Sequence, residues 1–204
     1  MLFRSGRFDE GKTVLENYLT RDPHNVKITE SVNQILELKK VFEEERQAEE
    51  LYRAHPDDIQ TALRLLIAYT RRQRHDAMDG LTSTLVSRPE LTSNEFLVIA
   101  KVYADSRRFD RLSDILTIYV QRFPKDPIGW YNLAIVYAAR QNCDGTLAAL
   151  QHALSLDSTA NEIHKMAQQD PRFTLCRKDP RFGALVAGRA QPLAPSDGSF
   201  TVTH

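Results

Sequence analysis

The stretch that decides the fold is residues 127–153, which read PIGWYNLAIVYAARQNCDGTLAALQHA. Trp130, Leu133 and Tyr137 follow one another at spacings of three and four positions, which places them on one face of a helix. A second apolar stripe begins after Asp144, an acidic residue that suits the positive end of a helix dipole. The stretch therefore predicts two amphipathic helices joined by a short turn.

The same pattern recurs upstream with a period of 34 residues. Tyr69, Tyr103 and Tyr137 are spaced 34 and 34 positions apart, and apolar residues stand four and seven positions before each of them. A fixed period of this length is typical of repeat architectures in which each unit is one supersecondary element. We therefore expect three consecutive helix–turn–helix units within residues 59–158.

These spacings resemble the tetratricopeptide repeat family. In the unit from Pro127, Trp130, Leu133, Ala134 and Tyr137 fall on the family pattern, whereas bulky Leu112 and Tyr119 replace small residues in the unit before it. The resemblance implies an all-α fold, a tetratricopeptide-like right-handed superhelix (α-solenoid) of antiparallel helix pairs. It extends over about residues 6–186 and is strongest over 59–158.

The region before these units matches the family only in part. Residues 1–24 are predicted to hold the second helix of a partial repeat, and residues 25–58 a degenerate repeat. The degenerate repeat favours two helices, near 26–38 and 42–54, although no Gly, Asn or Pro marks a turn between them. One long helix of about 28 residues, roughly 42 Å in length, is the alternative.

The region after these units is predicted to close the array. Residues 159–187 resemble the C-terminal capping segment of bacterial repeats of this family, with a helix near 160–168, and residues 188–204 have no period and indicate a flexible tail. Asp170 and Asp179 each precede a proline, the combination that starts a helix. The expected role of the cap is to cover the last apolar face, as repeat arrays require, with Phe173, Phe182, Leu185 and Val186.

Composition limits the kinds of partner. Lys and Arg total 27 and Asp and Glu total 27, so the net charge is zero and nucleic-acid binding is not expected. The longest apolar run, seven residues from Leu133, is far short of the roughly 20 that span a bilayer, and no signal peptide is recognised at the start. Two cysteines, Cys143 and Cys176, suit a reducing compartment and are expected to be small buried hydrophobes. A cytoplasmic protein is the resulting expectation.

Catalytic motifs are absent from the sequence. It has no Gly-rich phosphate loop, no Gly-x-Ser-x-Gly elbow and no His-Glu-x-x-His, and its six histidines stand singly. We therefore expect no enzyme activity, no cofactor and no metal site.

The resemblance implies a binding surface, because the first helices of successive units in this family line a concave groove. The groove positions here include several large apolar residues, which tend to mark contact sites. A groove filled by the chain's own tail or by neighbouring helices is the alternative. The predicted peptide groove consists of Leu63, Ile67, Asn94, Leu97, Lys101, Ile128, Tyr131 and Ile135.

A second candidate surface is a basic ridge along the turns between paired helices. Arg72, Arg74, Arg107 and Arg108 would form it and would bind an acidic peptide or polyanion. The favoured alternative is that these arginines satisfy the last carbonyls and the negative dipole end of a helix.

The predicted function is a non-catalytic protein–protein interaction scaffold that binds an extended or helical peptide in its groove. The alternative is the docking or regulatory portion of a larger enzyme or membrane protein whose catalytic part lies upstream. The half-repeat at the start favours that alternative, because it would expose Phe8, Leu15 and Tyr18. We expect this apolar face to be covered by residues 25–54 or by self-association.

Overall fold

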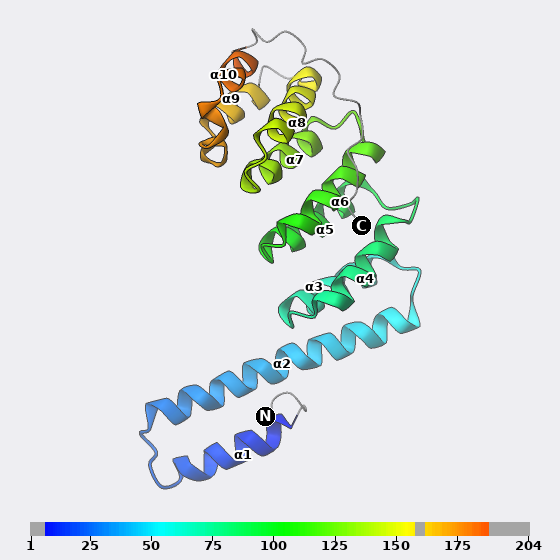
Figure 1. Cartoon of the computed structure of the whole chain (residues 1–204). Helices are drawn as coiled ribbons and strands as arrows, with labels where there is room; N and C mark the ends of the chain where they lie inside the picture. Colours follow the sequence, from blue (N-terminus) through cyan, green and yellow to red (C-terminus); the bar gives the residue numbers. More distant parts are fainter. Residues whose placement is uncertain (1–6, 158–161, 188–204) are drawn as a thin grey trace. The chain divides into compact units, whose positions relative to one another are not determined.

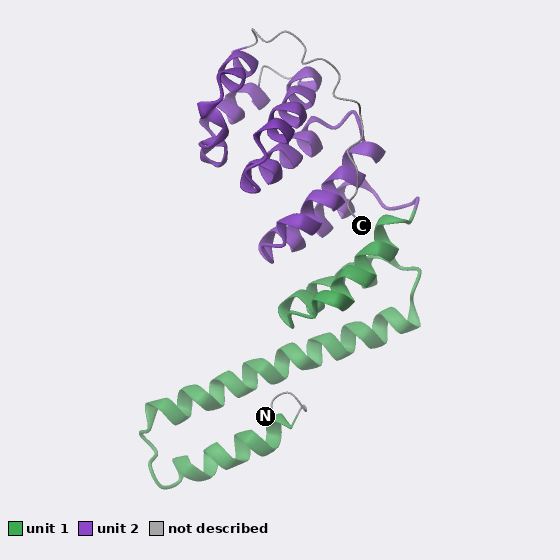
Figure 2. Ribbon diagram, viewed as in Figure 1, with its two compact units in different colours: residues 1–88 green, residues 89–204 purple. Residues whose placement is uncertain are grey.

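The computed structural model describes residues 7–157 and 162–187, and all regular structure within them is helical (Figure 1). The chain divides into two compact units, unit 1 up to Arg88 and unit 2 from Pro89 (Figure 2). Unit 1 contains α1 (Phe8–Leu19), α2 (Val26–Ala54), α3 (Ile59–Arg71) and α4 (His75–Val86). Unit 2 contains α5 (Ser93–Asp105), α6 (Phe109–Arg122), α7 (Pro127–Ala139), α8 (Cys143–Leu156), α9 (Glu162–Gln169), η2 (Pro171–Phe173), η3 (Cys176–Lys178) and α10 (Pro180–Val186).

The degenerate repeat is one continuous helix of 29 residues, α2, so the favoured interpretation of two helices was wrong. No helix-breaking residue stands near Lys39, and the contacts to α1 run across the expected break. Lys39 Nζ donates to Asp9 at 2.8 Å, and the rings of Phe8 and Phe42 meet edge to face at 5.5 Å. Packing on both sides of the expected turn therefore keeps the helix straight through it.

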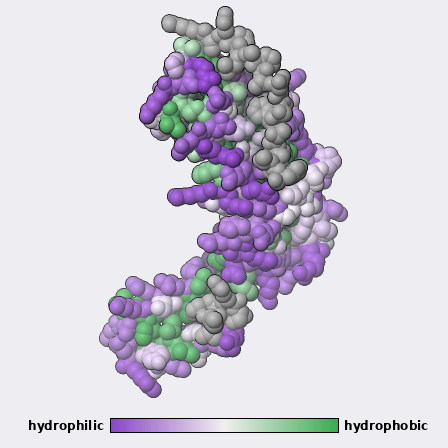
Figure 3. All heavy atoms as spheres, viewed as in Figure 1, coloured by the Kyte–Doolittle hydropathy of each residue, from purple (hydrophilic) through white to green (hydrophobic). Residues whose placement is uncertain are grey.

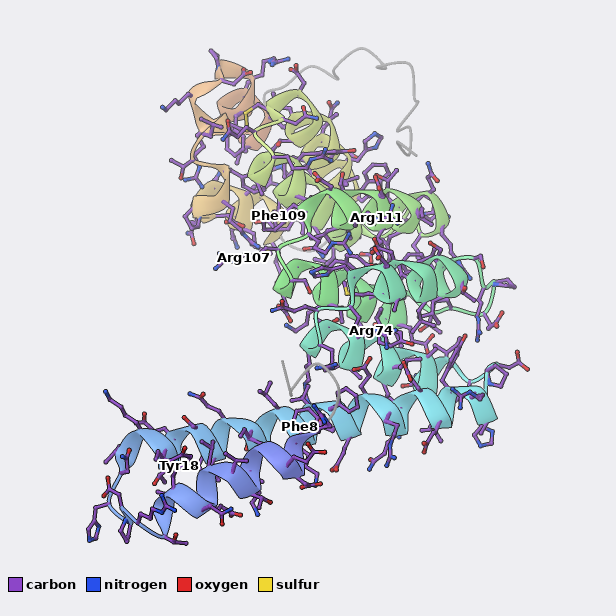
Figure 4. All side chains as sticks on the ribbon, turned by 60° about the horizontal axis from the view of Figure 1, so that its bottom comes forward. Phe8, Tyr18, Arg74, Arg107, Phe109 and Arg111 are labelled. Atoms are coloured by element: carbon purple, nitrogen blue, oxygen red, sulfur yellow. A yellow bond between two sulfur atoms is a disulfide. The ribbon has the colours of Figure 1, made fainter. Side chains whose placement is uncertain are left out.

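The first half of α2 covers part of the N-terminal half-repeat. Phe8 is buried beneath it and Leu15 is half-buried, whereas Tyr18 keeps 55% of its surface exposed (Figure 4). Residues 1–6, at the start of the predicted partial repeat, lie outside the described residues.

The turns inside the three predicted repeats share one backbone geometry. Gln73, Arg107 and Gln141 have φ values of 55°, 56° and 60°, and they recur every 34 residues. After each of them, the next backbone N–H donates to the carbonyl of the repeat tyrosine, as Arg74 does to Tyr69 at 2.9 Å. This is the Schellman ending of a helix, in which one left-handed residue turns the chain. The turns therefore recur with the same 34-residue period as the tyrosines.

The starts of the helices repeat as well. Asp58, Thr92 and Asp126 cap α3, α5 and α7 with their side chains, again 34 residues apart. Each second helix, α4, α6 and α8, has the predicted aspartate in its first turn. Satisfying the free N–H groups at these ends fixes where each helix begins.

Bulky Tyr119 fits at a position where small residues are usual because α7 offers a glycine opposite it. A Cβ atom on Gly129 would lie 2.3 Å from the Tyr119 ring, closer than packed atoms can approach. Nearby Trp130 is buried, donates from Nε1 to the Pro124 carbonyl at 3.0 Å and stacks on His152. The core of unit 2 thus accommodates the departure from the family pattern, because the large side chain of Tyr119 lies against Gly129, which has none.

The C-terminal segment closes unit 2 as predicted. Asp170 caps the short helix η2 and Asp179 caps α10, each with proline at the first helical position. The α9 helix agrees with the helix expected near 160–168, of which residues 160–161 lie outside the described part. The predicted tail at 188–204 also lies outside it. The four predicted cap residues are all buried: Phe173, Phe182, Leu185 and Val186.

The two cysteines form a disulfide, which corrects the expectation of unpaired buried thiols. Cys143 at the start of α8 is bonded to Cys176 in η3, across 33 positions of sequence. The cap folds back onto α8 and brings together two residues that the sequence keeps far apart. Because disulfides are typical of oxidising environments, this bond removes the support that the cysteines lent to a reducing compartment.

Within the described residues, no helix combines the length and the apolar character needed to cross a membrane.

Candidate functional site

Unit 2 contains an open hollow of about 410 Å³ to which three of the predicted groove residues contribute. Leu97 and Lys101 enter it from α5, and Ile135 enters it from α7. They meet there because α5 and α7 are the first helices of consecutive pairs and present the same face. The remaining lining residues are Ala100, Ala104, Asp105, Leu112, Leu116, Asn132, Val136 and Arg172.

The hollow has an apolar floor and a polar rim. Leu112 and Leu116 of α6 are buried beneath it, and Ala104 adds a short apolar side chain to the lining. At the rim, Lys101 Nζ donates to Asp105 at 2.8 Å, an exposed pair one turn apart on α5. Such a pair contributes little to stability, so both groups can exchange partners at low cost.

Arg172 is a member of the hollow that the sequence did not predict. It stands in η2 and binds Asp170, its capping residue, through both Nε and Nη2. The Asp-Pro-Arg-Phe motif signalled the helix start but not the direction of this side chain. The hollow is therefore completed by the cap as well as by the repeats.

Tyr131 does not line the hollow, which corrects its place in the predicted groove. It is 2% exposed, lies edge to face on Phe173, and donates its hydroxyl to Asp170 at 2.8 Å. Burial and this hydrogen bond raise the pKa of Tyr131 above its ordinary value. The hydrogen bonds from the Arg172 side chain lower the pKa of Asp170 to about 2. The cap covers the face of α7 that would otherwise be open at Tyr131.

Ile128 and Asn94 are exposed but lie outside the hollow. They belong to the first turns of α7 and α5, and Ile128 keeps 41% of its surface accessible. Neither residue is among those that line the hollow. These two predicted groove residues are therefore on the surface and do not belong to this hollow.

In unit 1, the predicted groove residues separate in the same way. Leu63 is 6% exposed and belongs to the core, because its face of α3 is covered, so its prediction as a groove residue was wrong. Ile67 is 40% exposed and lines a hollow of about 310 Å³ between α2 and α3. The other lining residues are Glu44, Gln47, Ala48, Leu51, Arg64, Ala68 and Arg71.

The arginines predicted as a basic ridge in unit 1 are engaged by α2. Arg72 Nε donates to Glu45 at 2.7 Å, and Arg74 Nη1 donates to Glu45 at 2.6 Å and to Glu49 at 2.9 Å. Glu45 is 5% exposed, so its charge is compensated almost entirely by these two arginines. Arg72 and Arg74 thus join α3 to α2, a role that neither sequence interpretation anticipated, and they do not form an open cationic surface.

In unit 2, the two ridge arginines differ from each other. The Arg108 guanidinium lies 5.7 Å from the centre of the Tyr103 ring, as Arg74 does over Tyr69 at 5.0 Å. Arg107 occupies the left-handed turn position and is exposed at the turn between α5 and α6 (Figure 4). Whether Arg107 and Arg108 bind an acidic partner remains a prediction.

Among residues 7–157 and 162–187, no group of three or more His, Cys, Asp or Glu side chains is arranged to hold a metal ion. Tyr131 and Asp170, whose pKa values are both displaced, pair with each other inside the fold. Their pairing serves the packing of the cap.

The recurring turn, cap and tyrosine geometry defines an all-helical repeat of the tetratricopeptide-like kind. No protein-family model matches the chain, and no curated protein matches it. Among solved structures, the chain is similar to one named "MamA MSR-1 C2", with 20% sequence identity over 76% of this chain and 90% of that chain and a TM-score of 0.43.

Proposed function

We propose that the chain is a non-catalytic protein–protein interaction scaffold whose unit 2 binds an extended or helical peptide in the hollow between α5 and α7. The observation that carries this proposal is the convergence of Leu97, Lys101 and Ile135 on one open concavity. A concave site with an apolar floor and a few polar groups at its rim is the usual form of a ligand site.

The lining indicates what such a peptide would present. One apolar side chain would enter over Leu112 and Leu116, where apolar surface is removed from water. Asn132 and Lys101 would meet polar groups of the peptide at the rim. Charged groups of both signs are present, with Asp105 beside Lys101 and Arg172 beside Asp170. The hollow therefore favours neither a strongly acidic nor a strongly basic peptide.

The test begins with peptides selected from a random library on the intact, oxidised chain. A selected peptide is titrated into the isotopically labelled protein while amide NMR shifts are recorded. We expect the largest shifts at Leu97, Lys101 and Ile135. A double variant, Leu97→Asp with Ile135→Asp, should weaken binding by about a hundredfold, because two charges would be placed on the contact surface.

Ile128→Asp is the matched control. It introduces the same charge on α7 at an exposed residue outside the hollow, so binding should be unchanged. Circular dichroism and melting of all variants exclude a loss of fold. Peptides whose binding survives the double variant, or a library that yields no binder, would contradict the proposal.

A further inference from the structure

The long helix α2 is covered unequally along its length. In its second half, α3 lies against it, and the arginines at the end of α3 and in the following turn bind Glu44, Glu45 and Glu49 (Figure 1). In its first half, α1 packs on one side through Val32 and Ile35, which are buried. Another side of this first half remains open.

The open side continues the stripe of α2 that lines the hollow beside α3. Glu37, Val41, Glu44, Ala48 and Leu51 follow at spacings of four and three, so they share one helical face. The last three line the hollow of about 310 Å³ with α3. The first two line a second, more open hollow of about 540 Å³, and its other lining residues in the described part of the chain, Asn33, Gln34 and Leu38, also belong to α2.

This open surface contains two apolar residues. Leu38 is 44% exposed, and half-buried Val41 lines the same hollow. Figure 3 shows hydrophobic residues gathered at the surface over α1 and the first half of α2. An exposed apolar surface of this kind is a candidate contact site.

The charges of α2 distinguish its two halves. In the second part of α2, each of the five glutamates forms an ion pair with a lysine or arginine. The five glutamates are Glu43, Glu44, Glu45, Glu49 and Glu50. Glu37, which belongs to the stripe, and Glu30, two turns before it on the same face, are exposed and have no ion-pair partner among residues 7–157 and 162–187. The acidic groups of this helix face are therefore paired where α3 covers it, whereas Glu30 and Glu37 are unpaired within the described residues.

We propose that this stripe of α2, from Asn33 to Leu51, binds an amphipathic helix of another protein that has an apolar seam and an edge of lysine or arginine. The chain's own α3 shows the chemistry that this face accepts, since it brings apolar residues and arginines to it. Eighteen steps of helix correspond to about 27 Å, so a partner helix of about five turns matches the stripe. A second copy of α2 fits less well, because it would bring the same unpaired glutamates to the contact and like charges repel.

Two synthetic helices of about 18 residues test the proposal. Both have the same leucine seam, and one has lysines along its edge where the other has glutamates. Titrated against the intact chain by fluorescence anisotropy, the lysine helix should bind at least about tenfold more tightly, and the difference should shrink in high salt. Leu38→Asp should abolish binding of the lysine helix.

Charge reversal separates this contact from non-specific attraction. The double variant Glu30→Lys with Glu37→Lys should bind the glutamate helix in preference to the lysine helix. Asp57→Lys, an exposed reversal in the loop after α2, is the control and should leave the preference as it is. Circular dichroism confirms that each variant folds.

Three outcomes would overturn the proposal: equal binding of the two helices, an unchanged preference after charge reversal, or no binding of either helix. Sedimentation of the chain alone identifies the competing occupant. Concentration-dependent dimers that Leu38→Asp dissolves would assign the stripe to a second copy of this chain. Because the stripe lies in unit 1, none of these results depends on peptide binding in the hollow of unit 2.

Discussion

Unit 1 and unit 2 are built from the same kind of helix pair but are held together by different interactions. In unit 2, the Tyr119 ring packs against Gly129, the cap buries Tyr131, and a disulfide joins the cap to α8. In unit 1, Phe8 packs on Phe42, and ion pairs also join the long α2 to its neighbours, with Glu45 as a buried member. The cap thus covers part of α7 in unit 2, whereas the first half of α2 in unit 1 has an exposed face.

The largest effect is expected at the centre of unit 2. Trp130→Ala should destabilise the protein by about 3 to 5 kcal/mol, because a large buried side chain and its hydrogen bond to Pro124 are lost. Chemical denaturation monitored by circular dichroism measures the change. A loss below about 1 kcal/mol would show that this core is not closely packed and would contradict the assigned register.

Removing the disulfide should weaken unit 2 by nearly as much. The bond closes a loop of 33 residues, and the chain-entropy account gives about 4 kcal/mol for a loop of that length. Cys143→Ser with Cys176→Ser should lower the melting temperature, and a reducing agent should lower that of the parent chain but not that of the variant. Hydrogen exchange of α1 and α2 should be unaffected, and faster exchange there would refute the separation of the two units.

A smaller effect is expected in unit 1, at its buried carboxylate. Glu45→Ala leaves Arg72 and Arg74 without their shared partner and should cost about 2 kcal/mol. Glu50→Ala on the same helix removes an exposed pair with Arg46 and should cost less than about 0.5 kcal/mol. Equal losses for the two variants in urea unfolding would mean that the buried network does not fasten α2 to α3.

The attachment of the cap should also depend on pH. The pKa of Asp170 is lowered from 3.8 to about 2 in the folded chain, so its ionised form stabilises the fold above pH 4. This contribution, of the order of 1 to 2 kcal/mol, is lost as the pH falls from about 4 to 2. Asp170→Asn should lower the melting temperature at pH 6, and the difference from the parent should shrink as the pH falls. A constant difference would assign the effect to hydrogen bonding rather than to charge.

The smallest effects should be gains, and they should be alike in the two units. Gln73 in unit 1 and Gln141 in unit 2 have left-handed backbone conformations that glycine adopts without strain. Gln73→Gly and Gln141→Gly should each stabilise the chain by about 0.5 to 1 kcal/mol, measured by thermal unfolding. Arg140→Gly is the control. Arg140 ends α7 with a negative φ, so this substitution should destabilise the chain.

Much of the fold could be predicted from the sequence because its signals are local and repeated. The tyrosine period located the turns, and helical spacing brought Leu97, Lys101 and Ile135 to one hollow. The spacing of apolar residues could not decide whether α2 is one helix or two, because both alternatives have the same apolar pattern. Contacts to α1 decide between them.

The errors at the candidate site arise from distant parts of the chain. Tyr131 follows the groove pattern of its own helix, but the Asp170 that binds it lies 39 positions later. The partner of Cys143 is similarly remote, and no local spacing reveals that the cap returns to α8. Glu45 is likewise remote from the arginines that it binds, because Arg72 and Arg74 follow it by 27 and 29 positions.

The hydrogen bond from Tyr131 to Asp170 affects how the protein folds during its synthesis. During synthesis, α7 leaves the ribosome with the Tyr131 ring unsheltered, and 39 further residues must be translated before its acceptor exists. At about 5 to 20 residues per second this interval lasts about 2 to 8 seconds, long compared with the formation of a helix pair. The repeat that contains α7 therefore spends its first seconds as a nascent chain with an uncovered aromatic face, and it is completed only when the segment around Asp170 has been translated.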